Sequence, residues 1–92
     1  MGKIAVRIVV CGKVQGVFFR QSTMKKAREL GLSGYVKNLQ DGAVQIEAQG
    51  STEQIDELFK WCHIGPARAK VSSVHKEQID LFPGSSDFVV KR

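Results

Sequence analysis

Apolar side chains alternate with other residues near the start of the chain. From residue 4 to residue 10, every second position holds Ile or Val, and Arg7 lies between two of them. Successive side chains of a strand point to opposite faces of a sheet, and β-branched residues favour strands. The pattern therefore predicts a first strand over Lys3 to Cys11, with one face in a core and Arg7 on the other face.

The next segment, residues 12–19, contains two glycines and no helical periodicity, which predicts a loop. Either Ser22 or Thr23 can then begin a helix, because a hydroxyl oxygen can accept a hydrogen bond from an N–H group of the first turn. Gly31 is expected to end this helix. The apolar stripe of the predicted helix consists of Met24, Ala27 and Leu30.

Two extended runs follow, Gly34 to Leu39 and Ala43 to Gly50, on either side of the dipeptide Asp41-Gly42. This dipeptide tolerates the positive φ angles of a tight hairpin, so the two runs are predicted to pair as antiparallel strands. In the second run apolar and polar residues alternate, as expected when one face of the sheet is covered and the other is exposed to solvent.

A second helix is predicted from residue 51 onward. Ser51 and Gln54 have the spacing of a capping box, and Gly65-Pro66 provides the end of the helical segment. Apolar residues recur at the helical spacing i, i+3, i+4 and i+7, at Ile55, Leu58, Phe59 and Cys62.

The last third of the chain contains two further extended segments. Lys70 to Ile79 is predicted to be a fourth strand with imperfect alternation, and Asp87 to Lys91 a short fifth element in which Phe88 and Val90 point inward. The resulting order, βαββαβ, predicts an α+β, ferredoxin-like fold with a mostly antiparallel sheet and both helices on one face. A chain of 92 residues is too short for a second core, so residues 1–92 are expected to form a single domain.

Composition limits the class of protein. The apolar content of 42% and charged content of 25% are ordinary for a soluble globular protein. The nearest candidate for a membrane span, residues 4–11, is interrupted by Arg7 and is much shorter than the ~18 residues that a span needs. There is no recognisable signal peptide, so we expect a cytoplasmic protein without membrane contact.

Cysteine and histidine residues give no sign of a metal site. Cys11 and Cys62 permit one disulfide but not the disulfide framework of a secreted scaffold. Together with His63 and His75 they match no recognised zinc spacing, so no metal ligand is predicted.

The formal net charge of +5 implies attraction to anions, which include nucleic acids, membrane surfaces and small phosphorylated substrates. Residues 12–20 are a local candidate for an anion site, because backbone N–H groups at a strand-to-helix turn point toward a common centre and the helix start is the positive end of its dipole. Arg20 adds a planar fork that can bind two phosphate oxygens. From the residues alone, a plain turn at Gly12 and Gly16 followed by a solvent-exposed arginine fits equally well.

Two segments resemble the signatures of a known family. GKVQGVFFR, residues 12–20, is similar to the first signature of the acylphosphatases, and GYVKNLQDG, residues 34–42, is similar to the second, at the usual distance. The likeness extends from about Lys3 to Arg92. Tyr35 stands where many members carry Trp, and because both are large aromatic residues the change concerns packing rather than chemistry.

The resemblance implies an enzyme that hydrolyses small-molecule acyl phosphates to a carboxylate and inorganic phosphate, with neither a metal ion nor a cofactor. It also implies a small, freestanding and monomeric protein. The residues implied to bind the phosphoryl group, mainly through backbone amides, are Gln15, Gly16, Val17, Phe18 and Phe19, together with the side chain of Arg20.

The second implied catalytic residue is Asn38, which would orient the nucleophilic water. A neutral amide can accept a hydrogen bond from water but cannot act as a strong base, so it would position the water without deprotonating it. The water's proton is then expected to pass to the bound phosphate. Without the resemblance, Asn38 would be an ordinary turn residue beside Asp41-Gly42.

The rival interpretation is a basic RNA-binding module, because RRM domains share the βαββαβ order. Such a module stacks bases on aromatic side chains of its central strands. The segments Lys3 to Cys11 and Ala43 to Gly50 contain no aromatic residue. The sequence therefore favours the enzyme and predicts no specific nucleic-acid partner.

Overall fold

The computed structural model describes residues 2–83 and 87–91, and within them five strands form one sheet in the order β4-β1-β3-β2-β5. Neighbouring strands are antiparallel except for β2 and β5, which are parallel. The elements are β1 (Ile4–Lys13), α1 (Phe19–Glu29), β2 (Ser33–Asn38), β3 (Val44–Gly50), α2 (Thr52–Cys62), β4 (Lys70–Ile79) and β5 (Phe88–Val90). This is the ferredoxin-like α+β fold that the sequence predicts, with the short β5 added at the edge.

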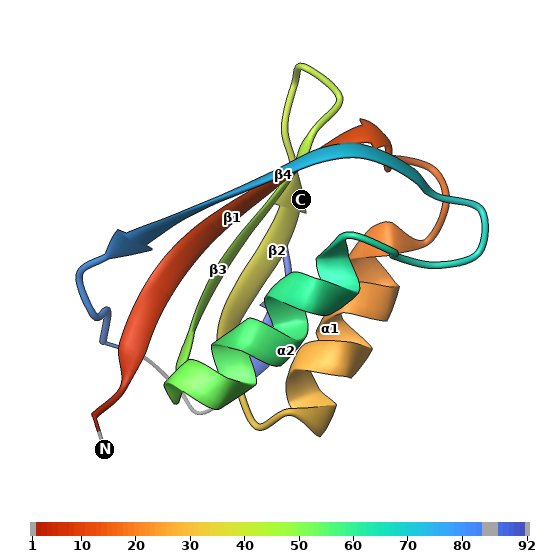
Figure 1. Cartoon of the computed structure of the whole chain (residues 1–92). Coiled ribbons are helices and arrows are strands. Elements are labelled where there is room, and N and C mark those ends of the chain that lie inside the picture. Colours follow the sequence, from red (N-terminus) through yellow and green to blue (C-terminus); the bar gives the residue numbers. More distant parts are fainter. Residues whose placement is uncertain (1, 84–86, 92) are drawn as a thin grey trace.

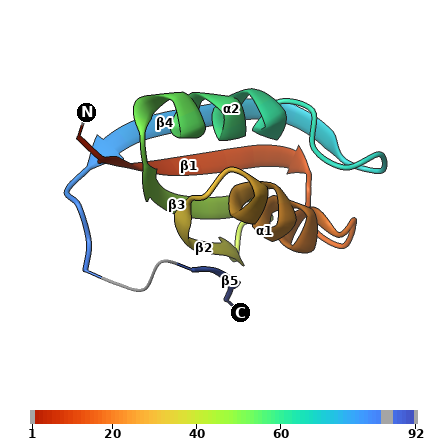
Figure 2. The same ribbon diagram turned by 90° about the horizontal axis from the view of Figure 1, so that it is seen from below.

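Both helices of this region cover the same face of the sheet, and the other face, called the bare face below, carries no helix of this region (Figure 1). Figure 2 shows them side by side, with α2 beside β4 and β1 and α1 beside β2. α1 packs against β2 and β5, and α2 packs against β1, β3 and β4. The predicted placement of two helices on one face is confirmed.

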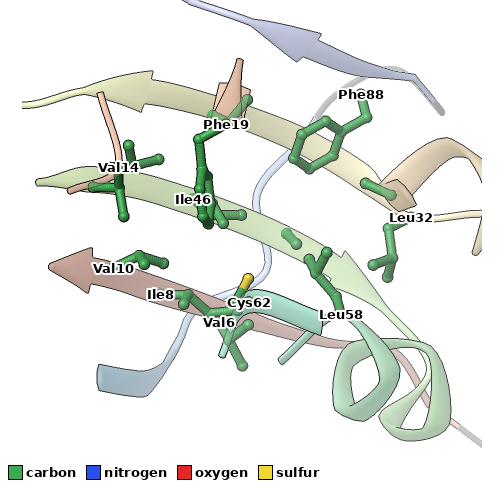
Figure 3. Close-up of a cluster of buried hydrophobic side chains, with 14 of the residues drawn as sticks. Val6, Ile8, Val10, Val14, Phe19, Leu32, Ile46, Leu58, Cys62 and Phe88 are labelled. Atoms are coloured by element: carbon green, nitrogen blue, oxygen red, sulfur yellow. The ribbon is translucent and has the colours of Figure 1, made fainter. Parts of the chain in front are cut away.

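The core lies between the sheet and the helices. It contains the alternating apolar residues of β1 and β3, together with Leu58 and Cys62 from α2, and Figure 3 shows these side chains gathered around the central strands. Phe88 of β5 is also fully buried, so the short last strand closes one side of the core. Complete burial of a side chain of this size contributes about 1.5–3 kcal/mol.

The capping box predicted at the start of α2 is confirmed. The Ser51 side chain accepts a hydrogen bond from the Gln54 N–H group, and the Gln54 side chain accepts one from the Ser51 N–H group. The predicted start of α1 is wrong, because the helix begins at Phe19 and neither Ser22 nor Thr23 caps it. Instead, the buried Thr23 hydroxyl donates a hydrogen bond of 2.8 Å to the Phe19 carbonyl inside the helix.

Two boundaries at the ends of strands also differ from the expectation. β1 continues to Lys13, because β4 pairs with its last residues across a register shift after Cys11. The loop before α1 therefore begins at Val14. The β2–β3 connection has five residues, 39–43, and is longer than the tight hairpin expected from Asp41-Gly42.

The bare face of the sheet carries a charged group at its centre. Arg7 donates hydrogen bonds of 2.9 Å to Glu47 on β3 and to Glu77 on β4. These hydrogen bonds raise the pKa of Arg7 above its ordinary value, and the hydrogen bond to Glu47 has the larger effect. The expectation that Arg7 lies on the face away from the core is confirmed.

The two cysteines are not bridged to each other, and their surroundings differ. Cys62 is fully buried, whereas Cys11 is partly exposed. Burial raises the pKa of the Cys62 thiol to about 12, because the thiolate would be desolvated.

We therefore expect one thiol to react quickly with a thiol reagent in the native protein near pH 8, and both thiols to react after unfolding in guanidinium chloride. The reactive form is the thiolate, which burial of Cys62 disfavours. A Cys11→Ser variant serves as the control and should show no fast reaction in the native state. Rapid labelling of Cys62 in this variant would contradict the burial.

Candidate active site

The sheet topology brings two distant segments to the same edge. β1 and β2 are each antiparallel to β3, which lies between them, so they run parallel to each other and end on the same side. Val10 of β1 and Asn38 of β2 both pair with Val44. With ~4.8 Å between neighbouring strands, Asn38 lies roughly 10 Å across the sheet from Val10, near the end of β1.

Strand alternation also decides which face Asn38 occupies. Val36, two residues earlier, is completely buried under the helices. Because residues i and i+2 of a strand point to the same face, the Asn38 side chain extends to the helix-covered face, at the end where α1 begins.

The loop over residues 14–18 connects β1 to that helix start. Three side chains anchor it in the core, those of Val14, Val17 and Phe19. The Phe19 ring also contacts the Trp61 ring, with 5.5 Å between ring centroids. These buried side chains hold both ends of the loop against the core.

The backbone angles of this loop alternate in sign. φ is +74° at Gly16 and +64° at Phe18, and it is not positive at Val17 between them. Alternation of this kind turns successive N–H groups toward one side and forms an anion-binding concavity. Phe18 is a bulky residue in a left-handed conformation, an arrangement that concentrates at functional sites.

The start of α1 is also suited to an anion. In the described part of the chain no side chain caps the helix, and its first turn contains no acidic residue. Among residues 2–83 and 87–91 there is no hydrogen-bond acceptor for the backbone N–H groups of residues 16–19. These donors, at the positive end of the helix dipole, remain available for a ligand.

A pocket of about 490 Å³ opens between this loop and the end of β2. Both predicted catalytic residues line it, Arg20 from the first turn of α1 and Asn38 from β2. The other lining residues are Val14, Gly16, Phe18, Phe19, Gln21 and Val90. The two segments that were singled out in the sequence therefore border one pocket.

Asn38 contributes an unpaired acceptor. Its side-chain oxygen Oδ1 is buried and has no hydrogen-bond partner within the described part of the chain. Leaving a buried acceptor unsatisfied costs about 1–3 kcal/mol, and native proteins rarely tolerate this without a reason. This marks Asn38 as a candidate for a functional role at the adjoining pocket, which it lines.

Arg20 is partly held in place by the end of the chain. Its Nη1 atom donates a hydrogen bond of 3.2 Å to the Lys91 carbonyl oxygen, just after β5. Arg28, further along α1, donates from Nε to the Phe88 carbonyl oxygen at 3.1 Å and forms an ion pair with Asp87. Arg28 therefore ties the helix to β5.

Two of the predicted phosphate-binding positions do not line the pocket, namely Gln15 and Val17. The Val17 side chain is 5% exposed and belongs to the core, and the Gln15 side chain points to the β2–β3 connection. Only their backbone groups could serve a ligand. Sequence reasoning did not identify Gln21 and Val90 as pocket residues, because their positions depend on the tertiary structure.

Comparison with known proteins identifies the family. The family model described as Acylphosphatase matches residues 6–90.

The chain belongs to the acylphosphatase family.

Curated relatives and solved structures agree with this assignment. The acylphosphatase of Pseudomonas paraeruginosa is 45% identical over 92 residues, which cover all of both chains. The structure of an acylphosphatase from Coxiella burnetii is 46% identical, with 97% of this chain and 93% of that chain covered and a TM-score of 0.90. The acylphosphatase structure from Bacillus subtilis is 30% identical, covers 97% and 99% of the two chains, and has a TM-score of 0.92.

This acylphosphatase is thus an enzyme that hydrolyses acyl phosphates, and small-molecule acyl phosphates are its substrate class. The predicted family and reaction are confirmed. No helix in the described residues is long and apolar enough to span a membrane.

Three other polar residues, Asp41, Glu47 and His63, have structural partners in this acylphosphatase. The Asp41 carboxylate accepts a hydrogen bond of 3.0 Å from the Ala43 N–H group within the turn, and Glu47 pairs with Arg7. The His63 ring nitrogen Nδ1 lies 2.8 Å from the Phe59 carbonyl oxygen at the end of α2. Residues 2–83 and 87–91 contain no group of three or more His, Cys, Asp or Glu side chains placed to hold a metal ion.

Proposed function

We propose that the pocket between the 14–18 loop and β2 binds the phosphoryl group of the substrate. The backbone N–H groups of residues 15–19 surround the phosphoryl oxygens, and the Arg20 guanidinium binds two of them. Asn38 holds the attacking water through Oδ1. The observation that carries this proposal is the buried Asn38 oxygen, which has no hydrogen-bond partner among the described residues and belongs to a side chain that lines the same pocket as Arg20.

The reaction can proceed with these groups alone. The water donates one hydrogen bond to Asn38 Oδ1, and its oxygen attacks phosphorus opposite the acyl oxygen. The bond between phosphorus and the acyl oxygen breaks, the carboxylate departs with that electron pair, and the water's proton passes to a phosphoryl oxygen. A carboxylate is a good leaving group, so positioning and charge stabilisation provide most of what the transfer requires.

The protein is further proposed to act as a single, monomeric domain in the cytoplasm, with no specific nucleic-acid partner. One continuous core joins residues from α1, α2, β1, β2, β3 and β5, and Val71 and Val74 of β4 pack against it, which supports a single folding unit. The bare sheet face carries the Arg7 ion pairs where an RRM presents stacking aromatics, which does not favour base recognition.

Hydrolysis of benzoyl phosphate in the presence of excess EDTA tests this chemistry. We expect full activity, together with competitive inhibition by inorganic phosphate, because the loop and Arg20 bind the group shared by substrate and product. A metal-dependent phosphatase treated in parallel confirms that chelation is effective. Activity that disappears with EDTA and returns with a divalent ion would contradict the proposed mechanism.

A further inference from the structure

Gln15 makes the only side-chain contact that joins the phosphate loop to the β2–β3 connection among the hydrogen bonds of the described residues. Its amide nitrogen Nε2 donates to the Leu39 carbonyl oxygen at 2.8 Å and to the Ala43 carbonyl oxygen at 2.9 Å. Both hydrogen bonds are partly buried and link positions 24 and 28 residues apart. The side chain is thus a tertiary crosslink and does not enter the pocket.

The two acceptors are the carbonyl groups that close the turn itself. The Leu39 N–H group donates to the Ala43 carbonyl at 2.8 Å, and the Gly42 N–H group donates to the Leu39 carbonyl at 3.2 Å. A carbonyl oxygen has two lone pairs, so each accepts one bond from the turn and a second from Gln15. The amide of Gln15 therefore holds both ends of the turn at once.

This contact connects the two halves of the proposed site. Gln15 directly precedes Gly16, where the phosphate loop turns, and Leu39 directly follows Asn38. Asn38 Oδ1 has no hydrogen bond of its own to hold it in the described structure. The position of the Asn38 amide relative to the loop must therefore be set by the backbone of the β2–β3 connection, to which the Gln15 side chain is hydrogen-bonded.

We propose that Gln15 is a positioning residue that sets the distance between the phosphate-binding loop and the Asn38 amide. This inference rests on the proposed role of Asn38 in holding the water. A misplacement of about 1 Å between reacting groups can lower a rate roughly 100-fold, so loss of the crosslink is expected to affect turnover. Phosphate binding should change little, because the loop is anchored separately by Val14, Val17 and Phe19.

The test replaces Gln15 with Met, which keeps the length of the side chain and removes both donors. We expect kcat for benzoyl phosphate to fall roughly 10- to 100-fold, while the inhibition constant of inorganic phosphate changes less than about threefold. Gln45→Met is the matched control, because it removes an amide donor that bonds to the Tyr35 hydroxyl on the other face of the sheet. That variant should retain the wild-type kcat.

A double-mutant cycle with Asn38→Ala separates positioning from general damage. If Gln15 acts through Asn38, Gln15→Met should cause little further loss of kcat once Asn38 is replaced. An equal loss in both backgrounds, an unchanged kcat in Gln15→Met, or a parallel loss of phosphate affinity would each overturn the inference. A wild-type kcat in Asn38→Ala alone would instead overturn the proposed role of Asn38, and the inference with it.

Discussion

Replacing Arg20 with alanine should lower kcat/KM for an acyl phosphate at least ~100- to 1,000-fold, the loss typical for removal of a preorganised donor that stabilises developing charge. The Arg20 side chain lines the pocket from the first turn of α1, next to the loop whose N–H groups have no acceptor within the described structure. Its hydrogen bond to the Lys91 carbonyl restricts it before substrate arrives. Steady-state kinetics with benzoyl phosphate measure the loss directly.

Two control variants distinguish the effect of the planar Arg20 guanidinium on activity from the effect of positive charge alone. Arg20→Lys keeps the charge and loses the planar, two-pronged geometry, so it should recover only part of the lost activity. Lys25→Ala removes an exposed charge from the same helix and should change kcat/KM less than about twofold, since surface charges are screened. Inorganic phosphate that inhibits Arg20→Ala as strongly as the wild type would exclude Arg20 from phosphate binding.

Replacing Asn38 with alanine should reduce kcat by a comparable ~100-fold or more, with a much smaller effect on inhibition by inorganic phosphate. The reason is that the proposed roles differ: the loop and Arg20 would bind the phosphoryl group, whereas Asn38 would hold the water. Comparison of kcat with the phosphate inhibition constant measures the two functions separately. Equal losses in both quantities would show that Asn38 contributes to phosphate binding instead.

The same variant should not lose stability. In the folded protein Oδ1 is a buried acceptor without a partner in the described region, and such an acceptor costs about 1–3 kcal/mol. Removal of the amide relieves this cost, so the midpoint of thermal unfolding is expected to stay the same or to rise. A catalytic residue commonly shows this combination of lower activity with unimpaired stability.

The strands and the second helix could be predicted from the sequence because local patterns determine them. The alternation of apolar residues predicts which face of β1 lies in the core, and the Ser51–Gln54 capping box marks the start of α2. The start of α1 could not be found in this way. A search for a capping hydroxyl favours Ser22 or Thr23, whereas a helix end that binds an anion needs its N–H groups unoccupied.

The candidate site was predictable only in part. The resemblance of two segments pointed to Arg20 and Asn38, and the order of the strands explains why both border one pocket. The contacts of Gln15 could not be predicted, because a glutamine in a loop has no periodic or capping signature and its partners lie in another hairpin. Its role depends on how the loop and the turn pack together.

The left-handed backbone conformation of Phe18 affects how much binding energy is needed to order the loop. The Phe18 side chain is 70% exposed and is not part of the buried core, so its conformation is maintained by the buried residues on either side of it. A left-handed backbone at a non-glycine residue costs of order 1–3 kcal/mol, and the protein bears this cost before any substrate binds. If the loop binds substrate as proposed, little of the binding energy is needed to order the loop, because its backbone is already shaped.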